Sequence, residues 1–303
     1  MDGYTQGHVE RKERRFTSCT QNPLFSYQIQ KNVHSYGPSS EIFIDDILKK
    51  SLIFKEKRLD LIGRKIMVDI HSHILPFLDD GAETMEEAVN MAYIAAKNGI
   101  NHIVASSHGN YYPYTIEEYR ESFKQLQKLL SEKKIPVKLY PGMEIFMDEC
   151  AISLIEQKKV LSVNETNYLL IEFPFEEKTE KVCKYIANLQ MKKYNVILAH
   201  PERYIFMQND PELAYYLEET GCILQVNRGS ILGEFGRNSR RLALQMLNDG
   251  IIKVIGTDAH DTEYRPPSVG KLLNFLRNNY SSRDIHLWLS ENPSRIIKGY
   301  PVL

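Results

Sequence analysis

The stretch Met67–Ala82 has the sequence MVDIHSHILPFLDDGA, in which a short aliphatic run leads directly into ionisable side chains. The run Met67–Ile70 is typical of a buried β-strand. His71 and His73 follow it two residues apart, and side chains at that spacing in an extended segment lie on one side. Two imidazoles on one side of a strand end suit two ligands of one metal ion. The stretch therefore predicts a strand that carries part of a metal site.

From Met67 to the C-terminus the chain repeats one unit, a short aliphatic or β-branched strand followed by an amphipathic helix. Repeated βα units with buried strands predict a parallel sheet, and their number predicts a closed or nearly closed α/β barrel. Two helix starts, Thr84–Glu87 and Thr115–Glu118, have the spacing of a capping box. The seven predicted strands are Met67–Ile70, His102–Ser106, Val137–Tyr140, Tyr168–Glu172, Val196–His200, Ile223–Val226 and Lys253–Gly256.

Ionisable side chains follow the predicted strands at the carboxyl ends, where reactive groups gather in barrels of this kind. Such groups are costly in a core unless they converge on a common ligand. We therefore predict a site for several metal ions, and His, Asp and Glu ligands without cysteine favour manganese, iron or zinc. His102 and His286 lie inside a predicted strand and helix, which favours a structural or exposed position. The groups at the strand ends are His71, His73, Asp79, Asp80, His108, Glu144, Glu172, His200, Glu202, Arg203, Asp258 and His260.

The composition of the 303 residues limits the class of protein. Hydrophobic residues make up 43% and charged residues 25%, which is typical of a globular protein with a core. The formal charge of −1 gives no basic field that attracts nucleic acid. No run approaches the roughly 20 apolar residues that span a bilayer, and the first residues lack the apolar segment of a secretory signal. The four scattered cysteines favour reduced thiols, so we expect a cytoplasmic protein.

Residues 1–66 differ from the rest of the chain because they lack sustained periodicity. Within them, Glu41–Phe54 (EIFIDDILKKSLIF) could form one short amphipathic helix, with Ser39 or Ser40 as its N-cap. We therefore expect a loosely ordered N-terminal extension over residues 1–66 and one barrel domain over residues 67–303.

Longer motifs around the strand ends resemble the PHP superfamily (polymerase and histidinol phosphatase), and within it the bacterial tyrosine-phosphatase branch of the CpsB/YwqE type. The resemblance extends from about Met67 to the C-terminus, and DDG after HSH together with HPERY separates this branch from histidinol phosphatases. It implies a PHP-type distorted TIM-like (β/α)7 barrel, so that residues 67–303 would form a PHP metallophosphatase domain. The motifs are MVDIHSHILPFLDDGA, SSHGNYYP (Ser106–Pro113), PGMEI (Pro141–Ile145), LLIEFPF (Leu169–Phe175), ILAHPERY (Ile197–Tyr204), NRGSILGEFG (Asn227–Gly236) and GTDAHD (Gly256–Asp261).

The resemblance also implies a site and an activity. It implies three divalent metal ions, usually manganese (Mn²⁺), with iron or zinc as alternatives. Arg203 and Arg265 match positions where the family binds phosphate. The implied activity is hydrolysis of phosphotyrosine on a protein, with a bacterial tyrosine kinase that regulates capsular or exopolysaccharide synthesis as the partner. The implied ligand sets are His71, His73 and Asp258 for the first ion, Glu144 as the bridge, Glu172 and His200 for the second ion, and Asp80, His108 and His260 for the third.

Several alternatives stay open at this point. The family usually has Thr-Pro-His where this chain has Ser106-Ser107-His108, which we expect to change the loop rather than metal binding. Aromatic residues after two strands either pack within loops or form a rim that stacks on a phosphotyrosine ring. A small-molecule phosphatase such as histidinol phosphatase, or a non-catalytic regulatory scaffold, is the alternative function. The aromatic residues are Tyr111, Tyr112, Tyr114, Phe173 and Phe175.

Overall fold

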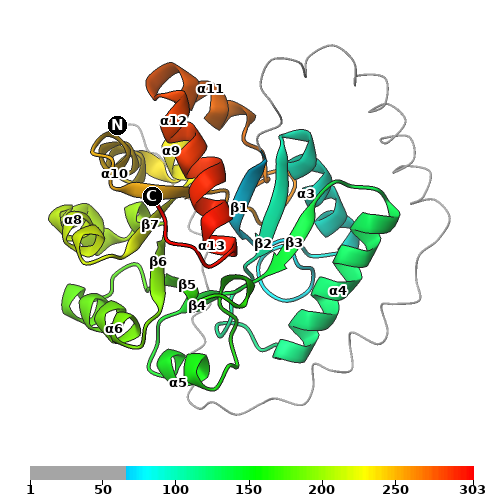
Figure 1. Cartoon of the computed structure of the whole chain (residues 1–303), viewed down its shortest axis with the longest axis horizontal. Coiled ribbons are helices and arrows are strands. Elements are labelled where there is room, and N and C mark those ends of the chain that lie inside the picture. Colours follow the sequence, from blue (N-terminus) through cyan, green and yellow to red (C-terminus); the bar gives the residue numbers. More distant parts are fainter. Residues whose placement is uncertain (1–65) are drawn as a thin grey trace, which may run out of the picture. The chain divides into compact units, whose positions relative to one another are not determined.

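The structure, a computed structural model, describes residues 66–303, and the expected extension with its helix at Glu41–Phe54 lies outside the described residues, apart from Ile66. Figure 1 shows the strands of this part at the centre and the helices around them. The strands pair in parallel, as the βα units predict, in two sheets with the orders β1-β2-β3 and β4-β5-β6-β7-β8. They are β1 (Met67–Ser72), β2 (Ile100–Ala105), β3 (Lys138–Pro141), β4 (Glu144–Phe146), β5 (Tyr168–Glu172), β6 (Asn195–Ala199), β7 (Ile223–Asn227) and β8 (Ile252–Gly256).

The two sheets close into a barrel through short junctions, which we call the seams. At the first seam Ser72 pairs with Ala259, just beyond β8, and at the second His108, just beyond β2, pairs with Glu144 of β4. β3 and β4 follow each other along the chain and together take the place of one strand in the barrel. They are interrupted at Gly142, where β2 approaches so closely that there is no room for a Cβ atom. The predicted (β/α)7 barrel is therefore confirmed, and β4 is the strand that the seven predicted ones do not include.

Helices follow most of the strands and pack on the outside of the barrel (Figure 1). The predicted capping box at Thr115 is complete, because Thr115 and Glu118 each accept a hydrogen bond from the backbone N–H of the other. At Thr84 only half of the box forms, since the Glu87 carboxylate accepts from the N–H of Glu83 instead. The helices are α3 (Met85–Lys97), α4 (Ile116–Glu132), α5 (Ala151–Glu156), η1 (Val163–Glu165), α6 (Thr179–Met191), η2 (Pro201–Arg203), α7 (Ile205–Asn209), α8 (Glu212–Glu219), α9 (Arg228–Leu232), α10 (Gly236–Asn248), α11 (Gly270–Asn279), α12 (Ser282–His286), η3 (Leu287–Glu291) and α13 (Asn292–Ile297).

Two hydrophobic cores hold the strands in place. Side chains that point into the barrel, such as Val68 and Leu170, pack with Ile296 of α13, while a larger core lies between the sheets and the outer helices. Full burial of a Val, Leu or Ile side chain contributes about 1.5–3 kcal/mol. Asn292, the first residue of α13, donates to the backbone oxygen of Lys253 near the amino end of β8. Because α13 covers the amino end of the barrel, the carboxyl end is left for a site.

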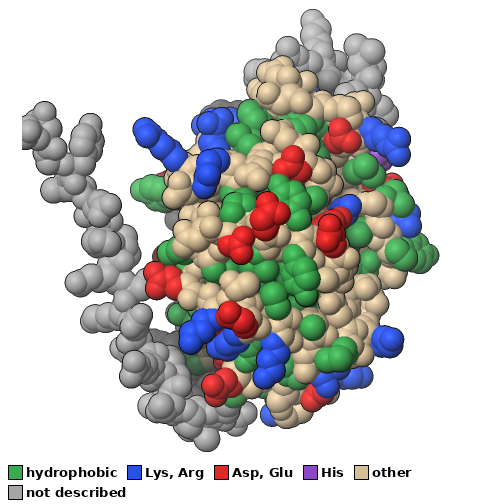
Figure 2. Space-filling model, turned by 90° about the vertical axis from the view of Figure 1, so that its left-hand side faces the viewer, with side chains coloured by type: hydrophobic (Ala, Val, Ile, Leu, Met, Phe, Trp, Pro, Cys, Tyr) green, Lys and Arg blue, Asp and Glu red, His purple; other side chains and the backbone are tan. Residues whose placement is uncertain are grey.

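Charged side chains of both signs are mixed on one face of the described part of the chain (Figure 2). On the face shown in Figure 2, acidic and basic side chains are interspersed with hydrophobic ones, without an extended region of one charge sign. This face therefore offers no basic surface of the kind that nucleic acids need. Within residues 66–303, no helix combines the length and the hydropathy needed to cross a bilayer.

Candidate metal centre

The ionisable side chains at the strand ends converge at the carboxyl end of the barrel. The nine candidate ligands form four overlapping groups, and within each group the ligand atoms lie within 4.8 Å of one another. They come from the ends of β1, β2, β5, β6 and β8, from the start of β4 and from the loop after β1. The groups are His73, Asp80, His108 and His260; His71, His73 and Glu144; His71, His200 and Asp258; and His108, Glu144 and Glu172.

Glu144 lies at the centre of this cluster. Its Oε2 atom is 3.3 Å from His71 Nε2 and 3.2 Å from His73 Nε2. Its Oε1 atom is 3.0 Å from His200 Nε2, and the residue is 1% exposed. A buried carboxylate with imidazoles on both oxygens can bridge two cations, which is the role that the family resemblance implies.

Two adjacent aspartates face different parts of the site. Asp80 Oδ1 lies 3.4 Å from the Nε2 atoms of both His108 and His260. Asp79 points inward, where its Oδ2 lies 2.8 Å from His73 Nδ1 and accepts from the backbone N–H of His108 at 2.9 Å. Asp79 thus fixes the ring of His73 and the loop after β2. Sequence reasoning singled out Asp80 as a ligand and missed this role of Asp79, which the Asp-Asp-Gly motif alone does not indicate.

The donor set fits divalent metal ions. The Nε2 atoms of His71 and His73 face each other at 3.4 Å, and the buried His200 Nδ1 has no hydrogen-bond partner among the described residues. Imidazole nitrogens and carboxylate oxygens that converge in this way match the ligand chemistry of manganese, iron and zinc. Glu172 lies 2.9 Å from His108 Nδ1 and 3.8 Å from His200 Nε2. Glu172 is therefore closer to His108 than to His200, whereas the family resemblance implies that it shares an ion with His200.

Charges within the cluster shift its pKa values. Burial opposes protonation of His73, but the Asp79 carboxylate outweighs it and raises the pKa of His73 to about 10. Burial also favours the neutral form of Glu144, yet the charge of His71 and the hydrogen bond from His200 hold the pKa of Glu144 well below its usual range. The cluster therefore attracts cations, and protons compete with metal ions because an imidazole must lose its proton to bind a metal.

Asp258 connects the cluster to the two arginines that the sequence analysis named. Its Oδ1 atom is 3.4 Å from His71 Nε2. Its Oδ2 atom is 3.1 Å from Arg203 Nη1 and 2.5 Å from Arg265 Nη2. Both guanidinium groups also lie over the ring of Phe235, at 4.5 and 5.5 Å from its centroid. Because the arginine side chains are 18% and 25% exposed, they can reach an anion that enters from solvent.

Two of the candidate ligands have an unusual backbone conformation. His200 has φ 37° and Asp258 has φ 51°, in the left-handed region that few residues other than glycine adopt. Each follows the end of a strand, so the left-handed turn redirects the chain where the side chain enters the cluster. Strained residues of this kind collect at functional sites.

The five aromatic residues fall into two groups by position. The rings of Tyr111 and Tyr112 lie beside His108, and Tyr111 is 54% exposed. Phe175 lies 5.1 Å from the guanidinium of Arg203. These three are placed at the rim of the site. The two that instead pack within the protein are Tyr114 and Phe173.

The geometry does not support a cysteine nucleophile. Cys222 and Arg228 have the Cys-x5-Arg spacing of cysteine-dependent phosphatases, which sequence reasoning missed. The strand β7 occupies the five residues between them, so the two lie at opposite ends of an extended segment and cannot form a phosphate-binding loop. Cys222 is 2% exposed, and burial raises the pKa of its thiol to about 12. A buried, protonated thiol is a poor nucleophile.

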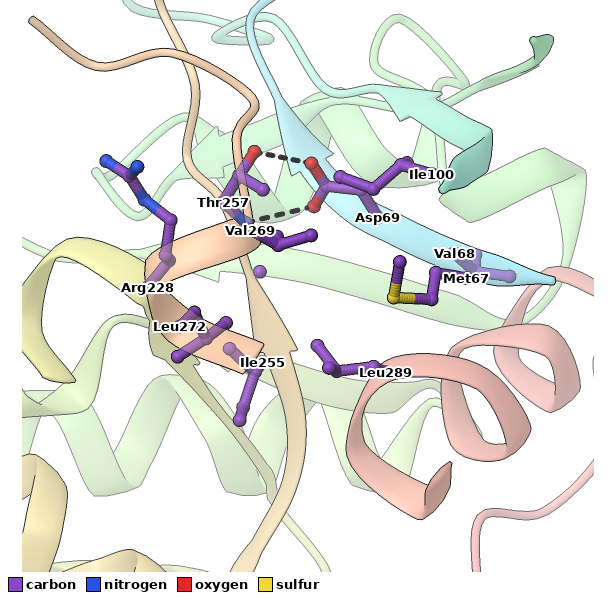
Figure 3. A pocket seen from close by; sticks show the side chains of 11 residues that line it. Met67, Val68, Asp69, Ile100, Arg228, Ile255, Thr257, Val269, Leu272 and Leu289 are labelled. Carbon is purple, nitrogen blue, oxygen red and sulfur yellow. Dashed lines mark hydrogen bonds between the residues drawn. The ribbon is translucent and has the colours of Figure 1, made fainter. Parts of the chain in front are cut away.

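A narrow pocket lies beside β1 and β8 (Figure 3), and none of the residues that line it is a candidate ligand. Its lining is mostly hydrophobic, and it has room for about one water molecule. At its edge both carboxylate oxygens of Asp69 accept hydrogen bonds from Thr257 (Figure 3). These bonds tie β1 to β8 directly before Asp258. The pocket is too small for a phosphorylated substrate.

Comparison with known proteins identifies relatives of the chain. A family model described as "Capsular polysaccharide synthesis, CpsB/CapC" matches residues 67–298. The tyrosine-protein phosphatase YwqE of Bacillus subtilis (strain 168) is 33% identical over 238 residues, which cover 78% of this chain and 93% of YwqE. The putative tyrosine-protein phosphatase CapC of Staphylococcus aureus is 35% identical over 210 residues, which cover 69% of this chain and 82% of CapC.

A solved structure shares the fold. It comes from work on YwqE from Bacillus subtilis and CpsB from Streptococcus pneumoniae, described there as unique metal-dependent tyrosine phosphatases. It superposes with a TM-score of 0.72 at 32% identity, and the match covers 78% of this chain and 96% of that chain. The family match begins at the first residue of β1. The chain therefore belongs to the CpsB/CapC family of capsular polysaccharide synthesis.

Proposed function

We propose that this protein is a metal-dependent tyrosine-protein phosphatase, and that its substrate is phosphotyrosine on a bacterial tyrosine kinase that regulates capsular or exopolysaccharide synthesis. The observation that supports the activity most directly is the convergence of nine candidate metal ligands with two arginines at the open end of the barrel. Membership of the CpsB/CapC family and the similarity to the tyrosine-protein phosphatase YwqE support it further.

The proposed cofactors are three divalent ions, with Mn²⁺ expected and iron or zinc as alternatives. When bound, they would neutralise phosphoryl oxygens and activate a water molecule for attack on phosphorus. The protein itself would hold the ligands at fixed positions. Glu144 lies between the imidazoles of His71 and His73, and Asp79 contacts Nδ1 of His73. The proposed ligands are His71, His73, Asp80, His108, Glu144, Glu172, His200, Asp258 and His260.

Arg203 and Arg265 are the proposed phosphate-binding residues. Asp258 Oδ2 and the ring of Phe235 hold both guanidinium groups at the edge of the cluster. The Arg265 side chain is 25% exposed, so its guanidinium group can reach a phosphoryl oxygen. Charge-assisted hydrogen bonds from such donors stabilise the transition state as negative charge shifts toward the leaving oxygen. Because tyrosinate is a fairly good leaving group, we assign no separate general acid.

The aromatic rim supports a phosphotyrosine substrate. Tyr111 and Tyr112 lie on one side of the cluster and Phe175 beside Arg203 on another. A tyrosine ring whose phosphate contacts the cluster would meet these side chains, and stacked aromatic pairs contribute about 0.5–1.5 kcal/mol beyond their buried area.

Metal removal tests the proposal. The protein would be purified without chelator, its metal content measured, and its activity compared on a phosphotyrosine peptide and on histidinol phosphate. We expect bound divalent ions and activity on the peptide that EDTA abolishes and Mn²⁺ restores. Full activity in excess EDTA after prolonged dialysis contradicts the metal mechanism. Activity on histidinol phosphate alone favours a small-molecule phosphatase, and a metal-loaded protein that hydrolyses neither favours a regulatory scaffold.

Two histidine variants make the test specific. His108→Asn removes a proposed ligand and should lower both metal content and turnover. His286→Asn removes a partly exposed histidine near Glu291, outside the cluster, and should leave both unchanged. The kinase is tested by comparing kcat/KM for a phosphorylated capsule kinase and for an unrelated phosphotyrosine protein. Equal values would contradict the kinase as the specific substrate without affecting the proposed chemistry.

A further inference from the structure

β7 supplies none of the proposed ligands, yet two of its side chains contact them. Gln225 and Asn227 are both fully buried. Gln225 Oε1 lies 2.7 Å from His71 Nδ1, and Gln225 Nε2 donates to Asn227 Oδ1 at 2.9 Å. Asn227 Nδ2 then donates to Asp258 Oδ2 at 2.6 Å. A continuous chain of three hydrogen bonds therefore runs through two amides and joins His71 to Asp258.

The chemistry of the groups fixes the direction of every bond in this chain. Asp258 Oδ2 lies 3.1 Å from Arg203 Nη1 and 2.5 Å from Arg265 Nη2, and a carboxylate paired with two guanidinium groups only accepts hydrogen bonds. Asn227 must therefore present its NH₂ group to Asp258 and its oxygen to Gln225. Gln225 must in turn present its NH₂ group to Asn227 and its oxygen to the ring of His71. His71 Nδ1 must carry a proton, since an amide oxygen only accepts.

This direction has a consequence at the metal site. With Nδ1 protonated and bonded, Nε2 is the nitrogen of His71 that is left for a metal, and it is the atom that faces Glu144 and Asp258. The same chain holds Asp258 Oδ2 away from the cluster, so that Oδ1 faces inward. The backbone of Asn227 is itself fixed, because its N–H donates to the buried Glu202 Oε1 at 3.0 Å.

We propose that Gln225 and Asn227 are positioning residues of the metal centre, which fix the tautomer of His71 and the orientation of the Asp258 carboxylate through one polarised chain. The proposal rests on the proposed function, since it takes His71 and Asp258 to be ligands. Loss of partners that orient metal ligands typically weakens metal binding about 10- to 100-fold. A purely structural role for the two amides would lower the stability of the fold and leave the metal affinity unchanged.

Substitution by apolar side chains of similar size separates these roles. Gln225→Met and Asn227→Leu each interrupt the chain. For each we expect the Kd for Mn²⁺, measured by chelator competition, to rise about 10- to 100-fold. Turnover at saturating Mn²⁺ should be much less affected than the concentration of Mn²⁺ needed to reach it. Because both residues act in one chain, the double variant should lose less affinity than the two single losses combined.

Gln127→Met is the matched control, because Gln127 is a half-buried glutamine whose Oε1 accepts from the backbone N–H of Leu139 at 2.9 Å. It should keep the wild-type Kd for Mn²⁺ even if its Tm falls. If the β7 variants bind Mn²⁺ as tightly as this control, the proposal is wrong while the proposed function stands. If wild-type protein binds no divalent ion, the proposed function itself fails.

A measurement on wild-type protein keeps the proposal testable if the variants do not fold. In protein loaded with Zn²⁺, nitrogen-15 spectra of the histidine rings distinguish a proton on Nδ1 from one on Nε2. We expect His71 to carry its proton on Nδ1. A proton on His71 Nε2 would overturn the proposed chain.

Discussion

At the scale of single residues, Arg203 allows phosphate binding to be separated from metal binding. Arg265 also contacts Asp258 Oδ2, so this carboxylate keeps one guanidinium partner when Arg203 is removed. We therefore expect Arg203→Ala to keep its metal content while kcat/KM falls by on the order of 10²-fold, the scale for loss of a transition-state donor. Arg203→Lys should recover only part of this, because an ammonium group lacks the planar fork of donors. Metal analysis and kinetics on the same preparations check this.

The control for this prediction is Arg295→Ala. Arg295 is a partly exposed arginine that pairs with Glu291 at 3.5 Å near the amino end of the barrel. Its removal should leave kcat/KM unchanged even if the melting temperature falls. The same result for Arg203→Ala would show that Arg203 only stabilises the fold through Asp258.

The residues that sequence reasoning found and missed differ in a physical way. His71 and His73 could be predicted because their chemical type and two-residue spacing at a strand end indicate ligands directly. Asp79 and Gln225 could not, because their roles depend on which atoms face them across neighbouring strands and loops. A glutamine inside a strand carries no sign of the ligand it supports until the register of that strand is known.

At the scale of elements, the loop between β1 and α3 is fitted to the site through Gly81. A Cβ atom at Gly81 would lie 2.1 Å from the backbone oxygen of His73 and 2.6 Å from its Cβ atom. The N–H of Gly81 also donates to Asp79 Oδ1 at 3.0 Å. Gly81→Ala must therefore displace His73 or Asp79. We expect it to weaken Mn²⁺ binding by about tenfold or more, the scale for disturbed partners of metal ligands, as measured by chelator competition.

Gly270→Ala is the matched control, since the nearest atom to a Cβ there is Asn98 Oδ1 at 3.5 Å and Gly270 begins α11. Alanine is a better helix former than glycine by about 1 kcal/mol in a helix interior, so this control should fold with normal Mn²⁺ binding. Normal binding in Gly81→Ala as well would show that the loop adapts without moving the ligands.

The predicted elements fail where they are short. Seven strands could be predicted from aliphatic runs, but β4 has only three residues and no run of its own. It forms because Glu144–Phe146 lies in register with β5 and continues the wall begun by β3. Pairing of this kind is a property of the closed barrel and not of the local sequence.

At the scale of the whole molecule, the barrel should work without residues 1–60. Residues 66–303 contain both hydrophobic cores and all nine candidate ligands, and the family match begins at residue 67. We expect the truncated protein to keep kcat/KM on a phosphotyrosine peptide within about twofold, because it retains every described core side chain and every candidate ligand. Kinetics and thermal melting of both forms check this. An insoluble truncated protein, or one that loses most of its turnover, would show that the removed residues contribute to the barrel or its site.

The two seams of the barrel would link metal binding to the stability and the abundance of the protein in the cell. The backbone hydrogen bonds that cross them include Asp258 N–H to His71 O at 2.8 Å and Gly109 N–H to Glu144 O at 2.7 Å, and each of these two pairs includes a candidate ligand. An ion shared across a seam would act as a crosslink between the two sheets and stabilise the folded state by mass action. A cell short of metal would then hold a protein that opens and is degraded more readily, so that its abundance and its catalytic output would fall together.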